Sequence, residues 1–173
     1  MSEPLLVTRR LELWQPRAAD RLALGELTRP EAVRRFLGAA QSEADQFERF
    51  ARNAGSWWLY GYGAFIVREH GQAAVVGNIG VFHTWRGFGE GLDDTPEAGW
   101  ILAETHWGKG FAAEAMRAAL AWFDALHGAQ RIACMIAIDN VRSLRLAEKL
   151  GFSRYAEAEH DGEALVLLER RSV

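Results

Sequence analysis

The chain has 173 residues, of which 49% are hydrophobic, so it can bury the core of one domain spanning residues 1–173 without help from disulfides or metals. Its 20 Lys and Arg against 23 Asp and Glu give a formal net charge of −3, which provides no general attraction for nucleic acid. With one cysteine, no run long enough to cross a bilayer and no targeting segment, the sequence favours a cytoplasmic protein without a membrane partner.

The first half of the chain predicts a strand, three short helices and a hairpin. Polar and apolar residues alternate before Pro16, as in a strand. Pro30 suits the first turn of a helix and Ser42 an N-cap. Two segments rich in Val, Ile and Phe on either side of Gly71 predict an antiparallel hairpin. The expected bounds are 5–14 for the strand, 20–27, 30–37 and 42–52 for the helices, and 62–68 and 73–83 for the hairpin.

A Gly- and Asp-rich loop is expected over residues 85–95, and after it strands alternate with long helices. Such alternation implies helical crossovers within one sheet. The helix over 108–127 has small apolar residues such as Ala112 and Ala119 on one face and charged residues on the other, which indicates packing against the sheet. The expected strands are 97–103, 131–138 and 163–169, and the expected helices are 108–127 and 140–150.

A glycine-rich turn connects the strand over 97–103 to the helix that follows it. Gly108 and Gly110 remove side chains where a phosphate would approach, and the N–H groups of a first helical turn have no intrahelical acceptor. Residue 110 is not Ser or Thr, so a P-loop is excluded. The turn therefore predicts binding of a phosphorylated cofactor by Trp107, Gly108, Lys109, Gly110, Phe111 and Ala112.

A second helix start follows the next strand, because Asn140 suits an N-cap and Gly151 a C-terminal stop. Together with residues 8–13 and 107–115, the segment 140–152 makes the sequence resemble the GNAT superfamily of acetyltransferases, and within it the RimJ/RimL ribosomal-protein N-terminal acetyltransferase branch. The resemblance implies an α/β (α+β) single domain. Its central sheet would be mixed, mostly antiparallel and twisted, with helices on both faces and a splayed central strand pair.

The resemblance also implies acetyl-CoA as co-substrate. In the family, the main chain of the strand that holds Ile101, Leu102 and Ala103 binds the pantetheine arm and polarises the thioester carbonyl. Asn140 would bond the arm as well, and Arg142 is one of the basic residues that could reach the 3′-phosphate. No metal is expected, because the five histidines are scattered without ligand spacing.

Two residues are predicted to be catalytic. Glu97 matches the family's Glu-x-Gly-aromatic strand and is the leading candidate for the base that frees the amine, with Glu90, Asp93, Asp94 and Glu104 as competitors. Many GNAT enzymes have a tyrosine seven residues after the leading Asn as the acid for the thiolate, but this chain has Ala147 there. The RimJ/RimL pattern offers the hydroxyl of Ser143 instead.

The predicted acceptor is a primary amine. Freeing the lone pair at pH 7 costs about 1–1.4 kcal/mol for an α-amine and roughly 4.6 kcal/mol for lysine, which favours a protein N-terminus. Trp58, Trp85 and Glu97 are predicted to contact it. The alternatives are a small-molecule amine, such as an antibiotic or a polyamine, and a non-catalytic acetyl-CoA-binding module. Family likeness is also compatible with a homodimer.

Overall fold

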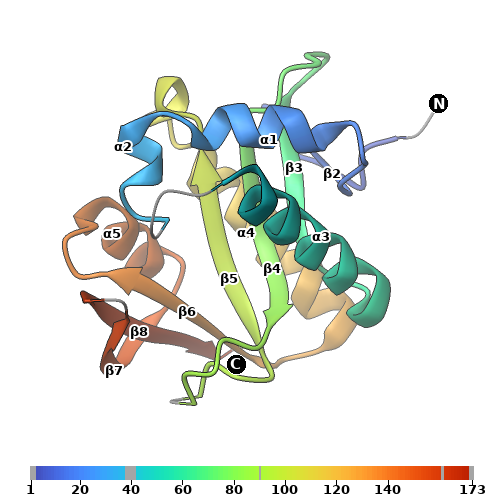
Figure 1. The fold of residues 1–173 in the computed structure, drawn as a ribbon. Helices are drawn as coiled ribbons and strands as arrows, with labels where there is room; N and C mark the ends of the chain where they lie inside the picture. Colours follow the sequence, from blue (N-terminus) through green and yellow to red (C-terminus); the bar gives the residue numbers. More distant parts are fainter. Residues whose placement is uncertain (1–2, 38–41, 90, 161, 172–173) are drawn as a thin grey trace.

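The computed structural model describes residues 3–37, 42–89, 91–160 and 162–171. Within these residues, eight strands form one sheet in the order β1-β2-β3-β4-β5-β6-β8-β7, with α1 and α3 over one face and α4 over the other (Figure 1). Among the strands of this described part of the chain, only β5 and β6 pair in parallel. The predicted mixed, mostly antiparallel sheet is confirmed.

The strands are β1 (Leu6–Val7), β2 (Leu11–Trp14), β3 (Ala64–Glu69), β4 (Gly77–Thr84), β5 (Thr95–Leu102), β6 (Arg131–Ala137), β7 (Ser153–His160) and β8 (Glu163–Arg171). The helices are α1 (Asp20–Thr28), α2 (Glu31–Arg34), α3 (Glu43–Tyr60), α4 (Phe111–His127) and α5 (Val141–Lys149), with a 3-10 turn η1 (Glu104–His106) before α4. No helix of the described part of the chain is both long enough and apolar enough to cross a bilayer.

The single strand predicted over residues 5–14 is wrong, because the chain turns back on itself between β1 and β2. Leu6 pairs with Leu13, and the N–H of Thr8 donates to the carbonyl of Leu11 at 2.8 Å. The Thr8 hydroxyl also accepts the N–H of Leu11 at 3.0 Å. A side chain that bonds its local backbone competes with a continuous strand.

Helix α3 ends eight residues later than predicted. It begins in a capping box, in which Ser42 and Asp45 each accept the other's backbone N–H, and it ends at Gly61 with a φ of +77°. Trp57 lies on this helix and packs edge-on against Phe65 with a centroid distance of 5.0 Å. Burial of this aromatic face outweighs the low intrinsic helix propensity of tryptophan. Helix α2, in contrast, is shorter than predicted.

Helix α4 lies behind the sheet in the view of Figure 1 and packs through the predicted small apolar face. Ala115 and Ala119 are fully buried in the main core, together with Met116 and Phe123. Small side chains let a helix approach the sheet closely, and this position fixes where the N-terminus of α4 meets the end of β5.

The candidate site lies at a gap between the parallel strands β5 and β6. Their only registered pair is Glu97 with Ala133, whereas β5 pairs with β4 along its whole length, from Thr95 to Leu102. Beyond Glu97 the two strands diverge, so the predicted splayed pair is confirmed. The C-terminal half of β5 therefore has one edge open toward β6.

Candidate active site

The glycine turn lies at the C-terminal end of β5, directly before α4. Gly108 and Gly110 have φ values of +75° and +78°, a region that favours glycine. A Cβ added at Gly108 would meet no heavy atom within 4 Å. Gly108, Lys109 and Gly110 are all exposed. The turn that precedes the first-turn N–H groups of α4 is thus open to solvent, as the predicted binding of a diphosphate requires.

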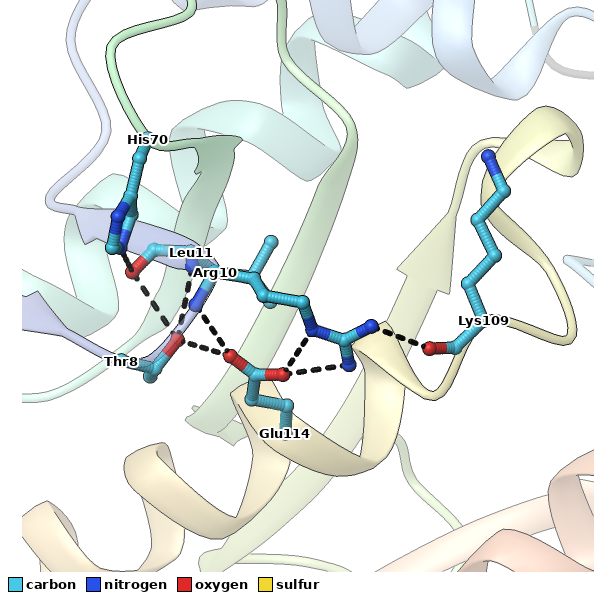
Figure 2. Close-up of polar contacts among 6 residues, drawn as sticks. All are labelled: Thr8, Arg10, Leu11, His70, Lys109 and Glu114. Carbon is cyan, nitrogen blue, oxygen red and sulfur yellow. Dashed lines mark hydrogen bonds and ion pairs between the residues drawn. The ribbon is translucent and has the colours of Figure 1, made fainter.

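The turn between β1 and β2 holds this loop in place (Figure 2). The Arg10 guanidinium donates through Nη1 to the carbonyl of Lys109 at 2.8 Å and binds Glu114 through Nε and Nη2, both at 2.7 Å. Its carbon also lies 4.4 Å from the centroid of the Phe111 ring. Arg10 therefore connects the N-terminal hairpin to the glycine turn and to the first turn of α4.

Glu114 places a negative charge beside the predicted phosphate site, where it would repel an anion. Its hydrogen-bond and ion-pair partners offset this charge. Besides Arg10, it accepts the Thr8 hydroxyl at 2.7 Å and the backbone N–H of Arg10 at 2.9 Å. Partial burial raises the pKa of Glu114, but the hydrogen bonds from Thr8 and Arg10 outweigh burial and lower it overall. Sequence reasoning missed this cluster, although its residues lie within two of the matching segments.

Two side-chain contacts connect the end of β5 to the start of α5. The indole Nε1 of Trp100 donates to Ser143 Oγ at 3.1 Å, and Arg142 lies over the Trp107 ring at 5.2 Å. Asn140 accepts the N–H of Ser143 at 3.2 Å and thereby caps α5, as predicted. The structure thus brings residues of all the predicted cofactor segments to one end of the β5–β6 gap.

Ser143 is oriented by its neighbours in a way that suits its predicted role. Its hydroxyl oxygen accepts a hydrogen bond from Trp100, so its own O–H remains available to donate. Two backbone groups predicted for the cofactor are already used within the protein. The carbonyl of Leu102 accepts the Trp107 indole N–H at 2.8 Å, and the N–H of Ala103 donates to Val76 at 2.9 Å.

Glu97 is 3% exposed and forms an ion pair that sequence reasoning did not foresee. Arg86 donates to both carboxylate oxygens, through Nε and Nη2, at 2.7 Å. The Thr84 hydroxyl donates to Oε2 at 2.8 Å. A carboxylate has about four lone-pair positions. Three donors leave one position, on Oε1, where a further proton can be accepted.

The predicted competitors of Glu97 are engaged elsewhere or exposed. Asp93 accepts backbone N–H groups of residues 86–89, and these bonds, that of Gly89 foremost, lower its pKa although desolvation opposes them. Asp94 contacts His83 Nε2 at 3.0 Å. Glu104 is exposed in η1, and Glu90 lies outside the described residues.

Two adjoining cavities lie between the helices that cover the sheet. The outer one has a volume of about 300 Å³ and is lined by residues of α1, α2 and α3, with Leu37. The inner one, of about 40 Å³, is lined partly by the same residues and ends at Asn78 of β4 and Ile101 of β5. The predicted acceptor contacts lie elsewhere: Trp58 is 88% exposed and Trp85 73% exposed.

The residues that the structure describes contain no group of three or more His, Cys, Asp or Glu side chains placed to hold a metal ion. Cys134 is 1% exposed. Burial raises the pKa of its thiol, and the negative charge of Glu97 raises it further. A thiol in this environment is a poor nucleophile.

Comparison with known proteins agrees with this geometry. The family model of the acetyltransferase (GNAT) domain matches residues 10–153. A Bordetella pertussis protein assigned to the GnaT acetyltransferase family is 40% identical, with a TM-score of 0.85 over 95% of this chain and 98% of its own. An acetyltransferase of Agrobacterium tumefaciens is 25% identical, with a TM-score of 0.82 over 99% of this chain and 96% of its own.

RimL, a ribosomal L7/L12 α-N-protein acetyltransferase solved in complex with coenzyme A, shares the fold at 17% identity, with a TM-score of 0.77 over 98% of each chain. The predicted fold and the predicted enzyme class are confirmed by these matches, and acetyl-CoA is the co-substrate of this class. The chain belongs to the GNAT acetyltransferase family.

Proposed function

We propose that this enzyme transfers acetyl from acetyl-CoA to the α-amine of a protein N-terminus. One observation carries the proposal: the N-termini of α4 and α5 meet at one end of the β5–β6 gap. Helix α4 follows the exposed turn at Gly108 and Gly110, and α5 carries Ser143 in its first turn. RimL, which has the same fold, is named as an α-N-protein acetyltransferase. The energetic preference for an α-amine over lysine supports the same acceptor.

In the proposed mechanism the amine attacks the thioester directly in a ternary complex. Acetyl-CoA supplies the activated acetyl group. The backbone N–H groups between Trp107 and Ala112 would hold the diphosphate. Asn140 and the main chain of Ile101, Leu102 and Ala103 would orient the arm, except for the Leu102 carbonyl and the Ala103 N–H, which are already bonded within the protein. A covalent acetyl-enzyme at Cys134 is disfavoured by the burial of that thiol.

Two proton movements complete the proposed mechanism. The Ser143 hydroxyl, whose oxygen is already bonded by Trp100, donates a hydrogen bond to the departing sulfur. A thiolate whose conjugate acid has a pKa near about 8.5 needs little further stabilisation at neutral pH. Glu97 accepts the amine proton at the free position of Oε1, directly or through a water. The proton neutralises the carboxylate, while the hydrogen bonds from Arg86 occupy other positions of the two oxygens and need not break.

The experiment that tests the proposal measures coenzyme A release with acetyl-CoA and a panel of acceptors. The panel contains peptides with free N-termini, the same peptides with blocked N-termini and one lysine, and small amines such as a polyamine and an aminoglycoside. Release with the free N-terminal peptides, and not with the blocked ones, is the expected result. Release only with small amines would move the acceptor to that class. Binding of coenzyme A without release for any acceptor would leave a non-catalytic binding module.

A further inference from the structure

The cavities between α1, α2 and α3 form one path from the surface to β5. The outer and inner cavities share Arg21, Gly25, Thr28 and Gln46 in their linings. The inner cavity reaches Ile101, which lies on the strand that carries the proposed base. An acceptor entering by this path would therefore arrive at the strand where acetyl transfer is proposed.

The lining of this path is predominantly basic. Arg21, Arg29, Arg34 and Arg49 line it, against Glu26 and Glu43 as acidic residues. Glu26 is already paired with Arg29, at 2.7 Å. Within the described residues, Arg21 and Arg34 are not paired with a carboxylate.

Arg49 places a positive charge in the lining of the inner cavity. Its Nη2 donates to the carbonyl of Leu37 at 3.0 Å, a neutral partner. Burial lowers the pKa of Arg49, and the like charges of Arg52 and Arg86 lower it further, while Asp45 opposes them. Arg86, which lies outside both cavity linings, is paired with Glu97, so the unpaired positive charge of the path is that of the cavity arginines.

We propose that this path binds the first residues of an acidic peptide, an inference that rests on the proposed N-terminal acetylation. Arg21 and Arg34 would bind side-chain carboxylates at the outer cavity, since guanidinium and carboxylate form paired, charge-assisted hydrogen bonds. The narrow inner cavity would admit only a small first residue, whose α-amine points toward Ile101. A polyamine or a lysine-rich peptide is disfavoured, because desolvated like charges repel.

The test measures peptide binding to the coenzyme A-loaded protein by calorimetry, so that it does not depend on turnover. Three six-residue peptides begin with Ser-Ala and continue with three Glu, three Gln or three Lys residues before a final Ala. We expect the Glu peptide to bind at least tenfold more tightly than the Gln peptide, with a preference that weakens as salt is raised. Equal binding of the Glu and Gln peptides would overturn the proposal.

Paired variants locate the site. Arg21→Gln/Arg34→Gln should lose at least tenfold in affinity for the Glu peptide and little for the Gln peptide. Arg117→Gln/Arg154→Gln removes the same charge from two exposed arginines on α4 and β7, and should keep the wild-type preference. If Arg21 proves necessary for folding, Arg34→Gln alone, on the surface of α2, should show a smaller loss of the same kind. If a folded Arg21→Gln/Arg34→Gln variant kept the wild-type preference for the Glu peptide, the proposed location of the binding site would be wrong.

Two further measurements distinguish failure of the acidic preference from failure of the proposed N-terminal acetylation. If free glutamate displaced the Glu peptide at equal concentration, the site would recognise a small anion and not a peptide. In the release assay, kcat/KM should follow the binding order. Acetylation of the Gln and Lys peptides with the same kcat/KM as the Glu peptide would overturn the acidic preference and leave N-terminal acetylation intact. Absence of release with any acceptor would overturn the enzymatic proposal, while the binding result would still decide the preference.

Discussion

Ser143 is held so that its oxygen is a hydrogen-bond acceptor and its proton is free. Trp100 Nε1 lies 3.1 Å from Oγ, and the N–H of Ser143 is used in the cap with Asn140. An alanine at this position removes only the hydroxyl, because the capping bond involves the backbone. The contact with a departing thiolate can therefore be tested without disturbing the start of α5.

We predict that Ser143→Ala lowers kcat by about 10- to 100-fold, with little change in KM for acetyl-CoA. A hydrogen bond to a charged group is worth about 1.5–3 kcal/mol, and each 1.36 kcal/mol in the barrier corresponds to about tenfold in rate. The measurement is steady-state coenzyme A release with the best peptide. Ser153→Ala, on the exposed start of β7, is the matched control. A wild-type kcat in Ser143→Ala would show that the thiolate leaves without this hydroxyl.

Glu97 is tested by the isosteric change Glu97→Gln, which keeps the shape of the side chain and removes its charge. Turnover at neutral pH should fall steeply, while the affinity for acetyl-CoA, measured by calorimetry, should stay close to that of the wild type. Glu104→Gln, on exposed η1, is the control and should remain active. Normal turnover in Glu97→Gln would exclude Glu97 as the base, and a loss in Glu104→Gln would transfer the role there.

The same substitution also probes stability, because Glu97 is buried against Arg86. Removing one partner of a buried pair costs about 3–5 kcal/mol. Arg86 is 30% exposed, so the cost here should lie below that range. The unfolding transition of Glu97→Gln must therefore be recorded beside its kinetics, and turnover compared at a temperature at which both proteins are folded.

At the scale of elements, the connection between the β1–β2 turn and α4 predicts a pH dependence of stability. The pKa of Glu114 is lowered in the folded protein. Its stabilisation is therefore present above the unfolded pKa, about 4.3, and is lost as the pH falls through the lower folded pKa. We expect the wild type to be more stable than Glu114→Gln by about 1–3 kcal/mol at pH 7, with the difference shrinking in acid.

Denaturant unfolding of both proteins between pH 7 and pH 3 is the measurement. Glu148→Gln, which changes an exposed carboxylate on α5, is the control and should match the wild type throughout. A difference between wild type and Glu114→Gln that stayed constant down to pH 3 would mean that the carboxylate charge does not contribute. The cost would then come from packing alone.

The elements that sequence reasoning predicted well are those whose signal is local. The start of α4 and the cap at Asn140 depend on residues a few positions apart: α4 begins at Phe111, three residues after the predicted start at 108, and Asn140 caps α5 as predicted. Strand β7, in contrast, was missed, because Ser153–His160 is polar and largely exposed. It forms because β8, the next strand of the same hairpin, offers a partner along its length, and this pairing overrides the weak strand signal of a polar edge strand.

The site shows the same limit. The cofactor segments could be predicted because each is continuous, whereas the ion pair of Arg86 with Glu97 joins a loop to a strand. The Arg10–Glu114 pair joins residues 104 positions apart. The basic cavity arises only when α1, α2 and α3 pack together. The charges along the chain sum to −3, and this net value could not indicate a local excess of arginine.

At the scale of the molecule, one sheet carries both halves of the proposed reaction. The cofactor elements meet at the β5–β6 gap, and the acceptor path runs between the helices on one face and ends at Ile101 of β5. Strand β5 is thus the element shared by the two substrates. Binding of acetyl-CoA should connect α4, β5 and α5, which are separate parts of the folded chain, and so stabilise the whole domain.

We predict that acetyl-CoA at 100 times its Kd raises the stability of the domain by about 2.7 kcal/mol, since a ligand that binds only the folded state stabilises it by mass action. For a domain of this size, this corresponds to a Tm increase of about 5–10 °C. Acetylpantetheine, which lacks the diphosphate, should give a much smaller shift at the same concentration.

Gly110→Ala should reduce the shift with acetyl-CoA, because alanine is strained at a φ of +78° and its Cβ would lie 3.5 Å from Arg10 Nη2. Gly61→Ala, at the C-terminal end of α3 with a φ of +77° and a ψ of 6°, carries the same left-handed backbone strain away from the loop and should keep the full shift. Equal shifts with acetyl-CoA and acetylpantetheine would show that the turn at Gly108 and Gly110 does not hold the diphosphate.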